Sequence, residues 1–390
     1  MTALVLSAAL AILQSAPAPA PPTEAVNEVA PVVVRALDPE KALAELEACV
    51  ARRCPPREDM RLSLRSVEAS FLAGSYEQAR GTLDQSLRRN RRHGRDHPVL
   101  LAGLYKADDT VNRHLGRGGD ARQSAQQARR LIGQVYGRES AEELWARFDA
   151  ADALMNNREY NAARAQYLRI LDGIDGRPWR RLQDSVELRL AWMPALEGRR
   201  RTAARRLGAL AGDEARDPFI RMSAGLLQLR LLPKGRQTEA ASAALERVRA
   251  QLGSAPEPVL VWSPQLDRRA EQEAALTLAL AGVPQPYVPD PSDWMDISFH
   301  IGSDGKVGDV RVLRTGKDAA PWHKEAVDIV SRRLYASPAD MEPGDRVHRV
   351  ERLAYTALVT AASTGSRFPN RALVPQLHVV DLSKLATTRE

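Results

Sequence analysis

The chain has 390 residues, of which 44% are hydrophobic, 5% aromatic and 27% charged, and its formal net charge is +7 at pH 7. A chain of this length and hydrophobic content can bury sizeable cores, so two or three domains are expected. The low aromatic content suits helices that pack through Ala and Leu, and the modest basic excess does not by itself indicate a nucleic-acid-binding surface.

The N-terminus has the pattern of an export signal. Residues 3–13 form an almost wholly apolar run of 11 residues, too short for a spanning helix of roughly 20 residues but suited to a secretory signal. Small residues such as Ser15 and Ala18 follow it, as a cleavage site requires. We predict a signal peptide over residues 1–18 and a Pro/Ala-rich leader over 19–37. The expected location is the periplasm, with membrane association if the signal is not cleaved.

The first helix is predicted to begin at Asp38-Pro39, with Asp38 as N-cap and Pro39 in the first helical position, and to run to about Arg53. Cys49 then lies inside the helix and Cys54 at its frayed end. A Cys54 released from helical geometry can fold back toward Cys49, so we predict a disulfide between them in an oxidising compartment. The alternative is two reduced thiols. A metal site is not expected, because no His or further Cys is near in sequence.

Helical hairpins repeat through the middle of the chain. The segment from Met60 to Leu87 contains two apolar stripes at helical spacing, separated by a turn at Gly74. Each later copy has a small residue where two helices can approach closely. These residues, with that of the first copy, are Ala79, Ala121, Ala163, Ala203 and Ala241. Five hairpins fit between about Asp59 and Leu252.

This pattern resembles tetratricopeptide repeats, in the longer form found in kinesin-light-chain-like arrays. The resemblance is carried by FLAGSYEQA (71–79) and LMNNREYNAA (154–163), and by the linkers HGRDHP (93–98) and VYGRESA (135–141). It implies a solenoid over residues 38–252; a generic α-solenoid is the alternative. Such arrays present a concave surface that binds extended peptides or helices, so protein or peptide partners are expected.

Two arginine runs, within residues 88–95 and 199–206, each allow two interpretations. Arginines near helix ends satisfy terminal carbonyl groups, and a basic run on a surface helix is usually solvated. A functional basic face would instead meet anionic components of the envelope, such as lipid or cell-wall polymer, or an acidic partner. Nucleic acid is not expected, because no base-stacking aromatic residues interleave with the arginines.

Beyond Leu252 we place a second domain, at residues 256–390. VLVW (259–262) is a candidate strand, a helix is expected over about 265–281, and the prolines of 283–291 fix an extended path. Three strands and one helix follow.

Alternating apolar residues predict a strand over 295–301, and 302–306 supplies the turn to a return strand over 307–312. A helix over about 319–335 and a long strand over about 346–360 complete an antiparallel sheet covered by one helix. The predicted fold class is therefore mainly α: a solenoid of helical hairpins followed by a small α+β domain.

The second domain resembles the C-terminal domain of TonB-family energy transducers. The match is carried by DISFHIGSDGKVGDVRVLRTG (296–316) and RRLYASP (332–338). The resemblance implies that a partner adds an extended strand to the exposed edge of the last strand, over about 347–358. The implied partner-binding positions are Val347, Arg349, Glu351, Leu353 and Tyr355. In the alternative, the chain's own tail covers this edge, and LHVVDL (377–382) has the β-propensity to do so.

Together these patterns predict an exported interaction scaffold or adaptor of the bacterial envelope. The alternative is a divergent TonB-like energy transducer for outer-membrane transport. An enzyme is not expected, because the sequence has no nucleophile elbow, phosphate-binding glycine loop or paired-carboxylate motif. No cofactor and no small-molecule substrate are predicted. His93 and His97 are not expected to bind a metal, because they lie in a linker that ends at Pro98.

Overall fold

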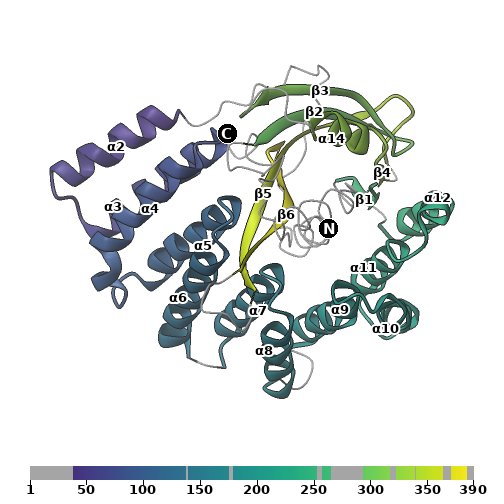
Figure 1. Ribbon diagram of the computed structural model, residues 1–390, viewed down its shortest axis with the longest axis horizontal. Helices are drawn as coiled ribbons and strands as arrows, with labels where there is room; N and C mark the ends of the chain where they lie inside the picture. Colours follow the sequence, from purple (N-terminus) through teal and green to yellow (C-terminus); the bar gives the residue numbers. More distant parts are fainter. Residues whose placement is uncertain are drawn as a thin grey trace.

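In the computed structural model, helical hairpins form an arc, and a small sheet domain joins the two ends of that arc (Figure 1). The predicted fold class is thus confirmed. The structure describes residues 38–137, 139–174, 179–252, 257–264, 293–316, 322–338, 340–362 and 370–383. Three predicted segments lie outside the described residues: the signal peptide with its leader, the helix over 265–281 and the extended path over 283–291. Among the described helices, none is long and apolar enough to cross a membrane.

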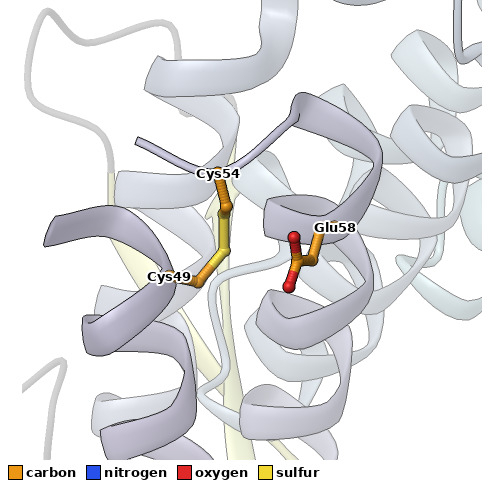
Figure 2. Close-up of side chains that lie close together, drawn as sticks. All are labelled: Cys49, Cys54 and Glu58. Carbon is orange, nitrogen blue, oxygen red and sulfur yellow. A yellow bond between two sulfur atoms is a disulfide. The ribbon is translucent and has the colours of Figure 1, made fainter. Parts of the chain in front are cut away.

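The first helix, α2 (Pro39–Ala51), begins where the sequence predicts. The Asp38 carboxylate accepts hydrogen bonds from the backbone N–H groups of Glu40 and Lys41, at 3.0 and 3.2 Å, and so caps the helix. Arg53 adopts a positive φ of 55° and reverses the chain. The reversal brings Cys54 back to Cys49, and the predicted disulfide is present with a Cα–Cα distance of 5.2 Å (Figure 2).

Five helical hairpins follow in the described part of the chain, as the repeats predict. Their helices are α3 (Pro56–Leu72) with α4 (Tyr76–Asn90), α5 (Pro98–His114) with α6 (Gly118–Tyr136), α7 (Ala141–Asn156) with α8 (Tyr160–Asp172), α9 (Arg180–Leu196) with α10 (Arg200–Gly212), and α11 (Pro218–Leu229) with α12 (Lys234–Leu252). A short 3-10 helix, η1 (Arg91–His93), precedes α5. The five predicted small residues, from Ala79 to Ala241, are all fully buried. Close helix contacts there leave no room for a larger side chain.

Four of the hairpin turns share one backbone device. Gly74, Gly116 and Gly198 have φ values of 80°, 70° and 82°, and Arg158 has a φ of 62° at the corresponding place in the third hairpin. In each case the next residue donates its N–H back to a carbonyl five residues earlier, which is the Schellman arrangement that ends a helix. The sequence suggests that Asn157 replaces the turn glycine. The structure instead gives this role to Arg158.

The sheet domain contains the strands β1 (Val259–Trp262), β2 (Trp294–Gly302), β3 (Val307–Thr315), β4 (Leu334–Ala336), β5 (Arg346–Ala362) and β6 (Asn370–Asp381), with the helix α14 (His323–Ser331). The main sheet is antiparallel with the order β3-β2-β5-β6, and β1 pairs with β4 in a second, two-stranded sheet. The expected helix over 319–335 is wrong at its C-terminal end. Residues 334–336 form β4 instead, because they pair with the antiparallel strand β1.

One face of the main sheet carries the core of the domain. Met295, Ile297, Phe299 and Ile301 of β2 are fully buried and pack with Trp322 at the start of α14. The opposite face of β2 reads as a polar, solvated face in the sequence. In the structure the first hairpin covers the beginning of this face, at Trp294 and Asp296.

This cover joins the two predicted domains into one packed unit. Trp294 and Ala354 of the sheet belong to the same apolar cluster as Met60, Val67 and Tyr76 of the first hairpin. At the other end of the arc, α12 lies against β1 and β4, and the guanidinium group of Arg249 donates to the carbonyl of Ser303 at 3.1 Å. The sheet domain therefore closes the arc.

Candidate functional site

The inner side of the arc is a surface that the repeats share. Figure 1 shows β5 and β6 running inside the arc, with α7 nearer to the strands than α8 and α9 nearer than α10. β5 contacts α5 and α6 directly. We name the surface of the arc that is turned toward these strands the inner face. The first part of this face holds an extended segment of the chain itself.

The chain's own tail covers part of the predicted strand edge. From Glu351 to Ala362, β5 pairs on one side with β6, and from Arg346 to Ala354 it pairs on the other side with β2. The tail segment 377–382 that the sequence offers as an alternative cover does form part of this pairing. β5 is thus paired on both sides from Glu351 to Ala354 and on one side over the rest of its length, so a partner strand has no open edge to join between Glu351 and Ala354.

The five predicted edge residues have other roles in the structure. Leu353 and Tyr355 are buried in the core of the sheet domain. Arg349 pairs with Asp381 at 2.7 Å, and Glu351 accepts from the buried guanidinium of Arg333 at 2.6 Å. Val347 is half buried opposite Ile301. Four of these side chains therefore contact other parts of the chain, and a role of the five positions in binding a partner strand stays a prediction.

A buried charge cluster fastens the sheet domain to the first hairpin. Arg352 is fully buried and donates to both carboxylate oxygens of Asp296, at 2.7 and 2.9 Å. It also donates to the carbonyl oxygens of Phe71 and Leu72, both at 2.7 Å. Arg314 adds a bond to the same Leu72 carbonyl at 2.8 Å. We name these groups the clamp.

The clamp uses the C-terminal end of α3. The last carbonyl groups of a helix lack partners within the helix and carry partial negative charge. Two guanidinium groups supply the missing donors. The ring of Trp294 completes the contact, with the Arg352 guanidinium 4.1 Å from its centre. A Cβ atom on Gly74 would lie 2.3 Å from this ring, so only glycine allows the indole to sit on the turn.

Two histidines meet beside the clamp, where β6 lies against α5. The rings of His114 and His378 are 4.7 Å apart, and His114 donates from Nδ1 to the carbonyl of Thr110 at 2.9 Å in the neutral form. Burial lowers the pKa of His114 to about 4, and the charges of Arg113 and Arg352 act in the same direction. Burial also lowers the pKa of His378 well below its ordinary value, assisted by His114 and Arg113. Both rings are therefore neutral at pH 7.

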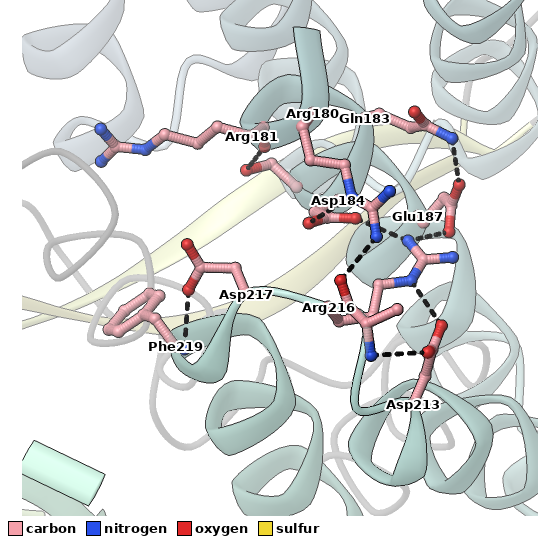
Figure 3. Close-up of polar contacts among 11 residues, drawn as sticks. Arg180, Arg181, Gln183, Asp184, Glu187, Asp213, Arg216, Asp217 and Phe219 are labelled. Carbon is pink, nitrogen blue, oxygen red and sulfur yellow. Dashed lines mark hydrogen bonds and ion pairs between the residues drawn. The ribbon is translucent and has the colours of Figure 1, made fainter. Parts of the chain in front are cut away.

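A second charge cluster stabilises the far half of the arc. Arg216, in the turn between α10 and α11, contacts Asp184 at 2.6 Å, Glu187 at 2.5 Å and Asp213 at 3.0 Å (Figure 3). Asp184 is fully buried on α9. A buried carboxylate is stable only when paired, so Arg216 fixes how the fifth hairpin sits on the fourth.

The arginine runs mostly serve the fold as well. Arg89 donates two hydrogen bonds to the buried Asp59, both at 2.8 Å, and Arg200 donates to carbonyls just beyond α11, including that of Leu231 at 3.1 Å. His93 lies in η1, where it accepts from Arg92 at 3.1 Å. These contacts support the structural interpretation of both runs.

One group in the described part of the chain has the residue types of a metal site. Cys49, Cys54 and Glu58 place their ligand atoms within 4.8 Å of one another (Figure 2). Both sulfur atoms are shared in the disulfide, so neither is a thiolate that could coordinate a metal.

The sequence did not predict the roles of four residues at this contact: Arg352, Asp296, Trp294 and His378. Asp296 and Trp294 alternate with the apolar residues of β2, which reads as a polar face. Arg352 and His378 are polar residues within strands. The sequence signals these positions only by a polar residue at regular spacing within a predicted strand. That pattern does not distinguish a side chain that faces water from one that is buried in an ion pair.

No protein-family model and no curated protein matches this chain. Solved structures to which the chain is similar include BtubC (BKLC) from P. vanneervenii, with 17% identity, coverage of 59% of this chain and 97% of that one, and a TM-score of 0.39. They also include a kinesin light chain with nearly identical TPR-like repeats from Podosopora anserina, with 16% identity, coverage of 55% and 96%, and a TM-score of 0.35. The helical-repeat architecture itself is seen directly in the five hairpins.

Proposed function

We propose that this protein is a protein-interaction scaffold that holds an extended polypeptide along the inner face of its arc. One observation carries the proposal: β5 and β6 already run inside the arc, and β5 contacts α5 and α6. The inner face thus accepts a strand-like segment. A partner segment of similar extended form would use the same surface further along, or would displace this one.

The physics of helical arrays supports binding over chemistry. Each hairpin buries its apolar stripe against its neighbours, so the remaining surface is a continuous array of side chains rather than a closed cavity. Two of the buried arginines also have structural partners: Arg352 with Asp296, and Arg189 with Asp152. Stacked hairpins with paired buried charges suit an adaptor that recognises chains by shape and charge.

The proposal is tested by photo-crosslinking in the native cell. A benzophenone amino acid replaces Asp149 of α7, whose side chain is 43% exposed and pairs with Lys106 of α5. A matched variant carries it at Arg169, an exposed residue of the outer helix α8. We expect one protein adduct from Asp149 alone, and the purified adduct partner should bind the purified chain. Equal adducts from both positions, or none from Asp149, would overturn the proposal.

We further propose that this scaffold works in an exported, oxidising compartment of the bacterial envelope. Two features support the location: the apolar run at residues 3–13 and the Cys49–Cys54 disulfide, since disulfides persist mainly outside the reducing cytosol. Alkylation of cells with a thiol-reactive polymer before reduction should leave both cysteines unmodified. A shift of both without prior reductant would contradict export with an oxidised pair.

The resemblance to the TonB C-terminal domain remains a prediction. The order strand, strand, helix, strand is present in β2, β3, α14 and β5, but this order is shared by many small α+β domains. The transducer alternative gains no specific contact from the structure, and the scaffold is the function that the inner face supports best.

A further inference from the structure

A groove at the beginning of α3 has the features of a second binding site. It encloses about 710 Å³ and is lined by Pro55, Arg57, Glu58, Arg61, Leu62 and Arg65. The three arginines are exposed, whereas Leu62 is half buried. Ligand sites commonly enclose roughly 300–1,000 Å³, so the groove has room for a short segment of a partner.

Positive charge dominates this groove. Its one acidic lining residue, Glu58, pairs with Arg52. In the part of the chain that the structure describes, no carboxylate lies within ion-pair distance of Arg57 or Arg61. Two exposed guanidinium groups are therefore left to meet an anion from outside.

These arginines differ from most others that the structure shows at contacts between elements. Arg89 binds Asp59, Arg216 binds Asp184, and both carboxylates are buried partners that hold helices together. Arg57 and Arg61 hold nothing comparable in the described chain. Arginines that lie beside an open groove without such a partner suit a ligand site, because a guanidinium group presents paired N–H donors that match a carboxylate.

The spacing of the arginines indicates the form of the ligand. Arg57, Arg61 and Arg65 are one helical turn apart, which places them about 6 Å apart along α3. Acidic side chains one turn apart on a helix have the same spacing, and those at alternate positions of an extended strand are roughly 6.6 Å apart. Leu62 adds apolar contact beneath the charges.

We propose that this groove binds an acidic segment of a partner protein, whose carboxylates pair with Arg57 and Arg61. Arg65 forms an ion pair with Glu45 of α2 at 2.8 Å. It would extend the row of arginines by exchanging Glu45 for a carboxylate of the partner. This site stands apart from the inner face, so either proposal can fail while the other holds.

The test uses the full chain and a fluorescein-labelled (Glu-Ala)4 peptide, with binding followed by anisotropy at low salt. Joint substitution Arg57→Gln and Arg61→Gln should weaken binding at least tenfold. The matched control, Arg91→Gln with Arg92→Gln, makes the same change of charge at exposed residues of η1 and should alter Kd less than twofold. Glu58→Gln should tighten binding two- to threefold, because it removes the acidic lining residue.

Three outcomes would overturn the proposal. Equal weakening by both arginine pairs would mean that the peptide senses only net charge. Absence of peptide binding by a folded chain would remove the site. Binding of phosphatidylglycerol vesicles that depends on Arg57 and Arg61, without peptide binding, would assign the groove to a membrane surface instead.

Discussion

Arg352→Leu should separate the sheet domain from the first hairpin. The substitution removes four hydrogen bonds of a fully buried guanidinium group: two to Asp296 and one each to the carbonyls of Phe71 and Leu72. Removing one partner of a buried ion pair costs about 3–5 kcal/mol, because the other charge stays buried without compensation. Asp296 keeps Arg314 at 2.5 Å, so we expect a loss near the lower limit, about 3 kcal/mol.

The loss is measured from urea unfolding of the full chain, using the midpoint and the slope. A spin-label pair, one label on the first hairpin and one on β3, reports separately whether the clamp has opened. Arg311→Leu, at an exposed position of β3, is the matched control and should cost less than about 0.5 kcal/mol. The double variant with Asp296→Leu should cost less than Arg352→Leu alone, since no buried charge is then left. A loss below about 1 kcal/mol for Arg352→Leu, with unchanged label distances, would refute this account of the clamp.

Three further predictions concern single features. Burial lowers the pKa of His114 from 6.5 to about 4, so between these pH values the unfolded chain binds a proton that the folded chain does not. The contribution of His114 to stability is therefore complete above pH 6.5, and the free energy of unfolding should fall by up to about 3 kcal/mol as the pH approaches 4. Equilibrium unfolding at several pH values checks this, and His378→Phe should change the slope of the unfolding free energy against pH. Gly74→Ala should cost at least about 2 kcal/mol in urea unfolding, because the positive φ is strained and the new Cβ meets Trp294. Cys54→Ser should cost about 2 kcal/mol, from the chain entropy of a short closed loop.

Each of these has its own control. Gly198 has a φ of 82° but open space around its Cβ direction, so Gly198→Ala should show only the backbone cost of about 1–2 kcal/mol. If both glycine variants lose the same stability, the contact with Trp294 is unimportant. Wild-type protein unfolded in reductant should match Cys54→Ser. If His114→Phe keeps the full pH dependence between 6.5 and 4, other groups are responsible for it.

Much of the local structure can be predicted from the sequence. The apolar stripes predict all five hairpins, because an amphipathic helix repeats every 3.6 residues wherever it packs. Asp38 and Pro39 mark the start of α2 through capping that involves only neighbouring residues. The short loop between Cys49 and Cys54 allows their disulfide to be predicted. In each case the physical cause lies within a few residues of the feature.

The candidate surfaces were harder to predict, because contacts between distant residues create them. The sequence leaves open whether the tail covers β5, since β-propensity does not choose a partner strand; β6 makes that choice in the folded chain. The groove beside α3 likewise needs the fold to show that Arg89 has an internal partner, whereas none is described for Arg57.

Periodicity reveals that a strand has two faces, but the tertiary structure decides what covers each one. The residues of β2 that alternate with the apolar set could face water, and in an isolated domain they would. Here Asp296 is buried and paired with Arg352. The same guanidinium group donates to the carbonyl of Phe71, which is 281 positions from Arg352 in the sequence. Closing a loop of that length is opposed by chain entropy, and only the combined packing of the first and last hairpins on one sheet domain offsets it. The sequence by itself therefore determines the hairpins and the strands β1, β2, β3 and β5, while the closure of the arc, and with it the occupied inner face, is decided by the fold.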